Sequence, residues 1–196
     1  MALIETLHAA RDVFVGMARL SLKRGFPLQR GGVLPAGSLQ LKFASYGDAS
    51  LPAVLLCPSM SNTPFPIDVP ELHAKGWWKS VVGHGTEFGI QLDQFRVIVP
   101  SPIGSPHGST SPLTERPDAD AHEYDESESG TNSYAKNKDK GKGDARQHRH
   151  RHWGPAFPVI TPADMADANA LLLDALGIEE VHAVIGGSMG GMQVRD

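Results

Sequence analysis

The chain has 196 residues, of which 40% are hydrophobic and 20% are charged, and its formal net charge is −4. This length predicts about one domain, and this composition is typical of a globular protein rather than a disordered one. Because no excess of basic residues is present, nucleic acid is not an expected partner. No apolar run is long enough to span a membrane, so we expect no membrane partner.

The first segment, residues 1–37, is interpreted as a leader. Residues 2–22 within it have the pattern of an amphipathic helix. Charged residues interrupt any secretory signal, and Glu5 and Asp12 are unusual in an organellar transit peptide. We therefore expect a cytoplasmic protein, with a mitochondrial location as the alternative.

Residues 38–112 are expected to form the first part of an α/β domain. Apolar and polar residues alternate from Leu39 to Phe43, which predicts a half-buried strand. Residues 53–57 and 95–99 are short apolar runs followed by proline, as in strands buried on both faces of a parallel sheet. The single cysteine, Cys57, ends the first of these runs, and we expect a buried free thiol.

The composition changes at residues 113–153, where an acidic block is followed by a basic block. Such a segment has too few apolar side chains to offset the entropy of ordering it, so we predict a disordered charged insertion. Histidine and arginine alternate over residues 148–152. Because the arginines repel a cation, no metal site is expected there.

Residues 154–196 are expected to form the second part of the α/β domain. Thr161 suits the N-cap of a helix, Pro162 suits its first turn, and Gly177 suits its end. The apolar run of residues 181–185 predicts the next strand. A strand, a helix and a strand in this order indicate a parallel sheet.

The segment from Gly186 to Gly190 has the pattern G-x-S-x-G and directly follows this predicted strand. In a nucleophile elbow, a serine at this position lies on a sharp strand-to-helix turn, and the flanking glycines leave room for the close backbone. Ser188 is therefore the predicted nucleophile, and the backbone N–H of Met189 is a predicted oxyanion donor. The alternative is a glycine-rich loop after a buried strand.

Several further blocks occur in the same order along the chain as in one known family. These blocks are Gly76-Trp77-Trp78, Val82-Gly83, Phe95-Arg96-Val97-Ile98, Gly108–Pro112, Phe157–Thr161, Leu171–Ile178 and Gly186–Gln193. With the serine motif, they resemble the homoserine O-acetyltransferases, a branch of the α/β-hydrolases. The resemblance implies the α/β class with a mostly parallel sheet and flanking helices. It also implies that this chain is the N-terminal part of an incomplete α/β-hydrolase fold, truncated after the nucleophile elbow.

The same resemblance implies an O-acyltransferase of methionine biosynthesis. Such an enzyme moves an acetyl group from acetyl-CoA to the hydroxyl of L-homoserine, or of L-serine, through an acyl-serine intermediate on Ser188. By position in the family's pattern, the N–H of Met60 would be the second oxyanion donor. Acetyl-CoA is a co-substrate, so the resemblance implies no bound cofactor and no metal, and the residues that bind CoA stay unassigned. The family usually has H-A-L-T-G where this chain has Pro58–Asn62. This difference leaves the acyl group and the acceptor open. The resemblance also leaves open a homodimer of the intact protein.

The triad of this superfamily follows the chain order Ser, Asp or Glu, His, so its later members are expected beyond residue 196. His84, His107 and His182 match no catalytic position of the family. A serine without a base is a poor nucleophile, so we expect the truncated chain to be inactive and its last strand to have an open edge. The alternatives are a serine hydrolase or esterase of the same fold and a non-catalytic fragment that acts as an interaction protein.

Overall fold

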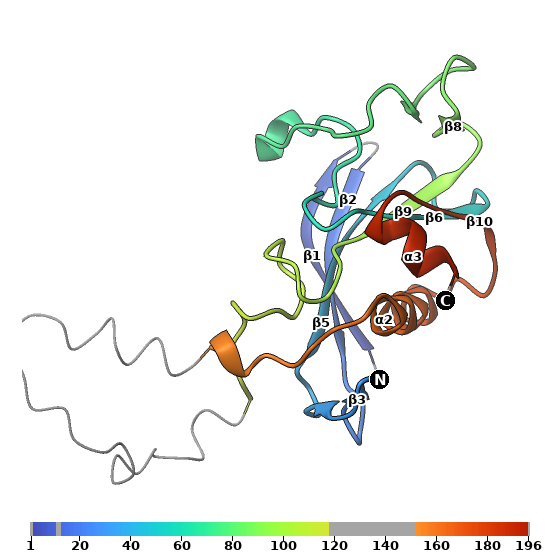
Figure 1. Ribbon diagram of the computed structural model, residues 1–196. Helices are drawn as coiled ribbons and strands as arrows, with labels where there is room; N and C mark the ends of the chain where they lie inside the picture. Colours follow the sequence, from blue (N-terminus) through green and yellow to red (C-terminus); the bar gives the residue numbers. More distant parts are fainter. Residues whose placement is uncertain (1, 11–12, 118–151, 196) are drawn as a thin grey trace, which may run out of the picture.

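The computed structural model describes residues 2–10, 13–117 and 152–195 (Figure 1). Most of the predicted insertion lies outside these residues, so its predicted disorder stays a prediction. None of the described helices is long and apolar enough to cross a membrane. The strands are β1 (Ala2–Ala10), β2 (Val13–Leu20), β3 (Phe26–Pro27), β4 (Val33–Leu34), β5 (Leu39–Tyr46), β6 (Ala53–Cys57), β7 (Val82–Gly83), β8 (Ile90–Gln91), β9 (Arg96–Pro100) and β10 (Val181–Gly186), and the α-helices are α2 (Pro162–Ala175) and α3 (Met189–Arg195).

A six-stranded mixed sheet with the order β1-β2-β5-β9-β6-β10 forms the centre of the molecule (Figure 1). Strands β1, β2, β5 and β9 pair antiparallel in turn. Strands β9, β6 and β10 pair parallel, as the two short apolar runs and the strand before the serine motif predicted. Helix α2 precedes β10 in the crossover, which is the expected strand–helix–strand unit.

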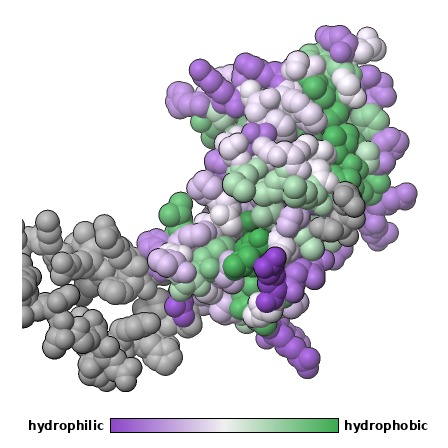
Figure 2. Space-filling model, viewed as in Figure 1, coloured by the Kyte–Doolittle hydropathy of each residue, from purple (hydrophilic) through white to green (hydrophobic). Residues whose placement is uncertain are grey.

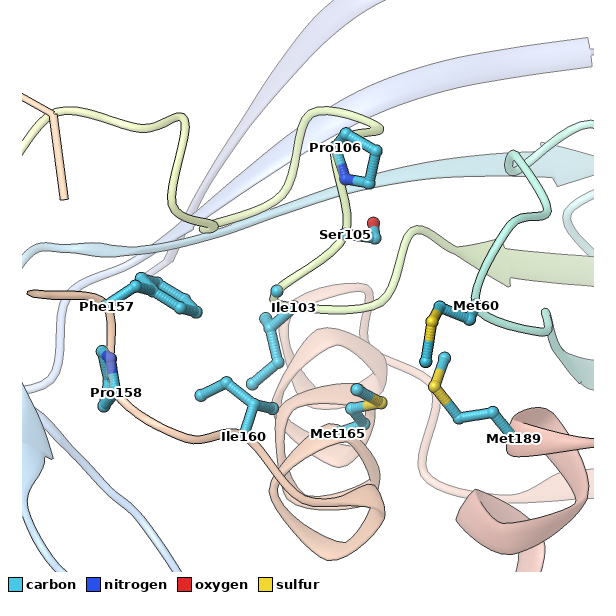
Figure 3. A pocket seen from close by; sticks show the side chains of 10 residues that line it. Met60, Ile103, Ser105, Pro106, Phe157, Pro158, Ile160, Met165 and Met189 are labelled. Carbon is cyan, nitrogen blue, oxygen red and sulfur yellow. The ribbon is translucent and has the colours of Figure 1, made fainter. Parts of the chain in front are cut away.

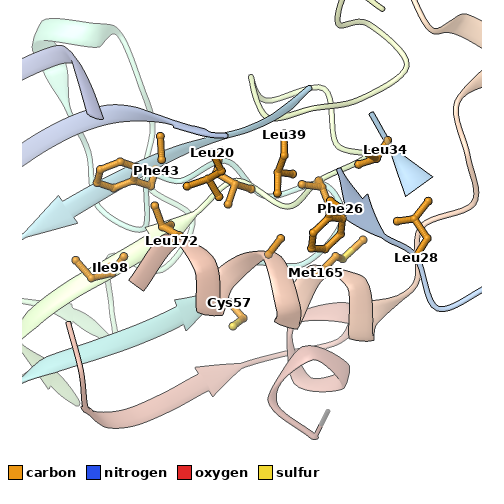
Figure 4. Packing of buried hydrophobic residues seen from close by; sticks show 14 of the residues in the cluster. Leu20, Phe26, Leu28, Leu34, Leu39, Phe43, Cys57, Ile98, Met165 and Leu172 are labelled. Carbon is orange, nitrogen blue, oxygen red and sulfur yellow. The ribbon is translucent and has the colours of Figure 1, made fainter. Parts of the chain in front are cut away.

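The two faces of the sheet bury two separate apolar clusters because side chains of a strand alternate in direction. In β6, Leu55 and Cys57 belong to the cluster that contains Met165 and Leu172 of α2 (Figure 4). Their neighbours Val54 and Leu56 belong to the other cluster, which residues of the 58–95 segment cover. All five residues of β6 are consequently buried, as expected of a strand covered on both faces.

The N-terminal residues form an antiparallel hairpin of β1 and β2, so the predicted amphipathic helix over residues 2–22 is wrong. Strand β2 also pairs with β5 along its whole length, from Val13–Tyr46 to Leu20–Leu39. Val15 and Ala18 are buried in the process. This strand pairing and burial outweigh a weak helical periodicity, because local propensity is easily overridden by tertiary packing.

The loop after β9 continues the sheet's hydrogen bonding where β9 itself has ended. The hydroxyl of Ser109 accepts from the N–H of Lys42 at 3.0 Å and donates to the carbonyl of Ser101 at 2.6 Å. The hydroxyl of Thr110 accepts from the N–H of Gln40 at 2.8 Å. Buried backbone groups need such partners, so the block Gly108–Pro112 holds this loop against β5.

Helix α2 begins with the predicted N-cap and is tied there to the N-terminal part of the chain. The Thr161 hydroxyl accepts from the N–H of Asp164, and the Asp164 carboxylate accepts from the N–H of Thr161 at 2.7 Å, which makes a capping box. The same carboxylate accepts from the N–H of Gln29 at 2.7 Å. Asp164 is fully buried, so it joins the start of α2 to a loop 135 residues earlier.

We predict that Asp164→Ala lowers the free energy of unfolding by about 2 kcal/mol, because it removes the carboxylate of the capping box and leaves the part-buried N–H groups of Thr161 and Gln29 without this acceptor. The midpoint of urea denaturation measures this loss. Asp174→Ala is the matched control, since Asp174 is exposed near the end of the same helix. Equal midpoints for the two variants would contradict the role given to Asp164.

Candidate active site

Ser188 lies on the sharp turn between β10, which ends at Gly186, and α3, which begins at Met189. The backbone of Ser188 is in the left-handed region, with φ 56°, and the residue is exposed to solvent. Among the non-glycine residues of the described ranges, only His73 shares a positive φ. A left-handed non-glycine residue costs about 1–3 kcal/mol and persists only where its surroundings impose it, and such residues cluster at active sites.

The glycines of the motif differ in why they are needed. A Cβ on Gly190 would lie 2.1 Å from the Cys57 carbonyl oxygen, and one on Gly186 would lie 2.4 Å from the backbone of Gly190. Neither position can hold a side chain unless the backbone moves. A Cβ on Gly187, at a variable position of the motif, would have no neighbour within 4 Å.

The predicted oxyanion residues lie at the same edge of the sheet. Strands β6 and β10 run parallel with Cys57 opposite Gly186, so the residues that follow each strand leave the sheet at one level. Met60 follows β6 and Met189 follows β10, and both line one cleft. Among the hydrogen bonds of the described residues, none uses the backbone N–H of Met60 or Met189. Their role as oxyanion donors stays a prediction.

This cleft has a volume of about 370 Å³, within the range of small-molecule sites, and we call it the methionine-lined cleft (Figure 3). It lies where β6, β9 and β10 have ended, which is the edge at which open α/β sheets bind ligands. Figure 3 shows the side chains of Met60 and Met189 at one end and those of Phe157 and Pro158 at the other. Its main apolar lining is Met60, Ile103, Phe157, Ile160, Met165 and Met189.

A buried polar network that the sequence did not predict lies behind the elbow. The Asn169 side-chain amide of α2 donates to the Gln193 side-chain carbonyl at 3.1 Å. The Gln193 amide is 3.5 Å from the Pro58 carbonyl and 3.4 Å from the Met189 carbonyl. It therefore bridges the two segments that carry the predicted oxyanion donors. The only sequence signal was a polar residue at position 169, on the same helix face as buried Met165.

Neither His84 nor His182 forms a hydrogen bond with Ser188, and each ring has another partner. His84 Nδ1 is 2.6 Å from Asp93 Oδ1. This hydrogen bond, and to a smaller extent the one from the N–H of Gly85, lowers the pKa of the exposed Asp93 carboxyl. The His182 ring packs against the Phe95 ring with centroids 4.8 Å apart and an interplanar angle of 33°. Within the described part of the chain, no side chain hydrogen-bonds to the Ser188 hydroxyl, and no group of three His, Cys, Asp or Glu residues could hold a metal.

Cys57 is a buried free cysteine, as predicted. Burial raises the pKa of its thiol to about 12. A thiol with this pKa is protonated at neutral pH, so Cys57 is not a second nucleophile at this edge of the sheet.

Comparisons with known proteins agree with this geometry. The family model described as "alpha/beta hydrolase fold" matches residues 52–195. A homoserine O-acetyltransferase of Bradyrhizobium diazoefficiens is 31% identical over 79% of this chain and 32% of its own length, and a homoserine O-succinyltransferase of Alkalilimnicola ehrlichii is 33% identical over 85% and 36%. The chain thus spans about a third of the length of the curated relatives it matches.

Solved structures show the same fold. The homoserine O-acetyltransferase of Bacillus anthracis superposes with a TM-score of 0.67 and 21% identity over 95% of this chain and 43% of that chain. The structure of esterase E22 gives a TM-score of 0.63 and 23% identity over 92% and 42%. At these identities the likeness concerns the fold alone, and it confirms the predicted α/β-hydrolase fold.

We predict that Gly190→Ala destabilises the chain by about 2 kcal/mol or more, because the added methyl group overlaps the Cys57 carbonyl. Gly187→Ala is the matched control, since it adds the same methyl group to open space one residue before Ser188. Urea denaturation of both variants measures the difference. A Gly190→Ala variant as stable as Gly187→Ala would show that the elbow does not pack against β6 as described.

We also predict that Cys57 resists an aromatic disulfide reagent in the folded chain at about pH 8 and reacts roughly 1,000-fold faster after unfolding in guanidinium chloride. The raised pKa keeps the folded thiol protonated, and unfolding returns it to its ordinary range. Because the chain has one cysteine, the absorbance of the released thiolate reports on Cys57 alone. Rapid labelling of one thiol in the folded chain would contradict this burial.

Proposed function

Because this chain belongs to the α/β-hydrolase family, we propose that it carries the nucleophile of an O-acyltransferase that acylates L-homoserine, or L-serine. The exposed, left-handed Ser188 at the end of β10 is the observation that carries this proposal. The names of the curated relatives, homoserine O-acetyltransferase and homoserine O-succinyltransferase, support the acceptor. We propose acetyl-CoA as the donor, acting as a co-substrate.

The proposed reaction has two acyl exchanges. The Ser188 hydroxyl attacks the thioester carbonyl, its proton passes to a base, and the CoA thiol leaves with a proton. The homoserine hydroxyl then attacks the acyl-serine ester, and Ser188 regains its proton as the product leaves. In each exchange the N–H groups of Met189 and Met60 would stabilise the tetrahedral oxyanion.

We propose that the base is a histidine paired with an acidic residue that follow this chain in the complete protein. This order is the one found in α/β-hydrolases. It is consistent with the Ser188 hydroxyl, which has no side-chain partner among the described residues, and with the relatives' length, of which this chain spans about a third. Because a serine without a base is a poor nucleophile, we expect the 196-residue chain alone to show no turnover.

A serine hydrolase is the second candidate function. The fold-level likeness to esterase E22 favours it, because the same elbow serves both reactions. The two differ in whether water or an amino-acid hydroxyl accepts the acyl group.

We predict that the complete protein containing this chain releases CoA from acetyl-CoA only when L-homoserine or L-serine is present. Ser188→Ala should reduce this release at least about 1,000-fold, because the nucleophile that takes the acyl group from CoA is removed. Ser80→Ala, at an exposed serine in a different loop, is the control. A thiol reagent follows the released CoA continuously.

The amino-acid dependence separates the candidates. Thioester loss that is independent of the amino acid would indicate a hydrolase and contradict the transferase. Turnover by the 196-residue chain alone would contradict the proposed external base. A fluorophosphonate probe that labels Ser188 rapidly in that chain would contradict it as well.

A further inference from the structure

The methionine-lined cleft is much larger than an acetyl group requires, and its chemistry is uniform. Among the described residues, its lining includes no charged side chain. Its one side-chain hydroxyl, that of Ser105, already pairs with the Ser101 hydroxyl at 3.1 Å. The lining therefore offers apolar contact and no partner for a buried charge.

The position of the cleft relates it to the acyl group. Met60 and Met189, whose N–H groups are the proposed oxyanion donors, line one end (Figure 3). The cleft then extends past Met165 and Ile160 toward Phe157. An acyl carbonyl bound at the methionine end would direct its chain along this apolar wall.

We propose that the methionine-lined cleft is an acyl-chain site for uncharged, linear acyl groups longer than acetyl, and that it discriminates against succinyl. This inference rests on the proposed acyl transfer at Ser188. Each buried methylene adds favourable apolar contact, whereas the terminal carboxylate of a succinyl group would lose its water and gain no cation. Relatives named for acetyl transfer and for succinyl transfer both resemble this chain, so the names of the relatives do not decide between these acyl groups.

The side chains of the cleft supply their own reporters. Three of the six methionines, Met60, Met165 and Met189, line it, whereas Met17 lies in β2. Methionine labelled with carbon-13 in its ε-methyl group gives one NMR signal for each residue. Displacements of the three cleft signals during titration measure binding at this site, and the Met17 signal reports on the fold.

The test titrates Ser188→Ala protein, which cannot be acylated, with N-acetylcysteamine thioesters of acetate, butyrate and succinate. We expect affinity to rise about fourfold for each added methylene from acetyl to butyryl. Succinyl should bind at least about tenfold more weakly than butyryl, because its carboxylate is desolvated without a partner. Equal affinities of the three thioesters, or displacement of none of the cleft signals, would overturn the proposal.

A charge added to the wall provides a second test. Ile160→Arg places a cation in the cleft and should reverse the preference, so that succinyl binds at least about tenfold more tightly than butyryl. Val159→Arg is the matched control, because Val159 is the neighbouring residue, is 65% exposed and does not line the cleft. A reversal by Val159→Arg alone, or by neither variant, would contradict the assignment. If Ile160→Arg changes the Met17 signal, Phe157→Arg, which charges the other end, takes its place with the same expectation.

Acyl transfer by the complete protein, with the same three acyl groups on CoA, distinguishes this inference from the proposed function. Transfer in the order butyryl, acetyl, succinyl supports both. Transfer that does not follow this order leaves the acyltransferase intact and overturns the acyl-chain site. Graded binding without any transfer supports the site and overturns the acyltransferase.

Discussion

The close contact between the backbone of Gly190 and the end of β6 is the constraint on which the rest of this structure depends. The parallel register places Gly186 opposite Cys57, and α3 then starts so near β6 that residue 190 can carry no side chain. In this tight turn Ser188 is in the left-handed region and is exposed. The left-handed conformation of Ser188 is thus a consequence of packing between two backbones rather than of the residue's own conformational preference.

The surroundings of the hydroxyl come from segments that are far apart in the sequence and are each anchored separately. The loop after β9 is held by the hydroxyls of Ser109 and Thr110, and the segment before α2 is held by Asp164. Behind the elbow, Gln193 bridges the carbonyls of Pro58 and Met189. Figure 2 shows hydrophobic residues in patches on the face viewed, with hydrophilic residues along much of its outline. The hydrogen bonds of Gln193 connect the segments that carry Met60, Met165 and Met189, which line the cleft.

The sequence predicted those features that depend on local chemistry. The cap at Thr161, the buried strand of residues 53–57 and the turn at Ser188 each follow from a few neighbouring residues. Features that depend on distant partners were missed. Residues 2–10 and 13–20 form paired strands because β5 is available to pair with β2, and no periodicity within the segment contains that information. The contact of Asn169 with Gln193 joins two helices 24 residues apart, so only the fold reveals it.

The described residues on the two sides of the predicted charged insertion are paired with each other. Glu115 and His152 form an antiparallel bridge, and the N–H of Trp153 donates to the carbonyl of Thr114 at 3.0 Å. Glu115 and His152 are therefore separated by the spacing of two neighbouring strands. Closing a flexible connection costs only about 0.6 kcal/mol more for each doubling of its length. This junction is accordingly a natural grafting point, at which a peptide of foreign sequence could be exchanged without shifting β9 relative to α2.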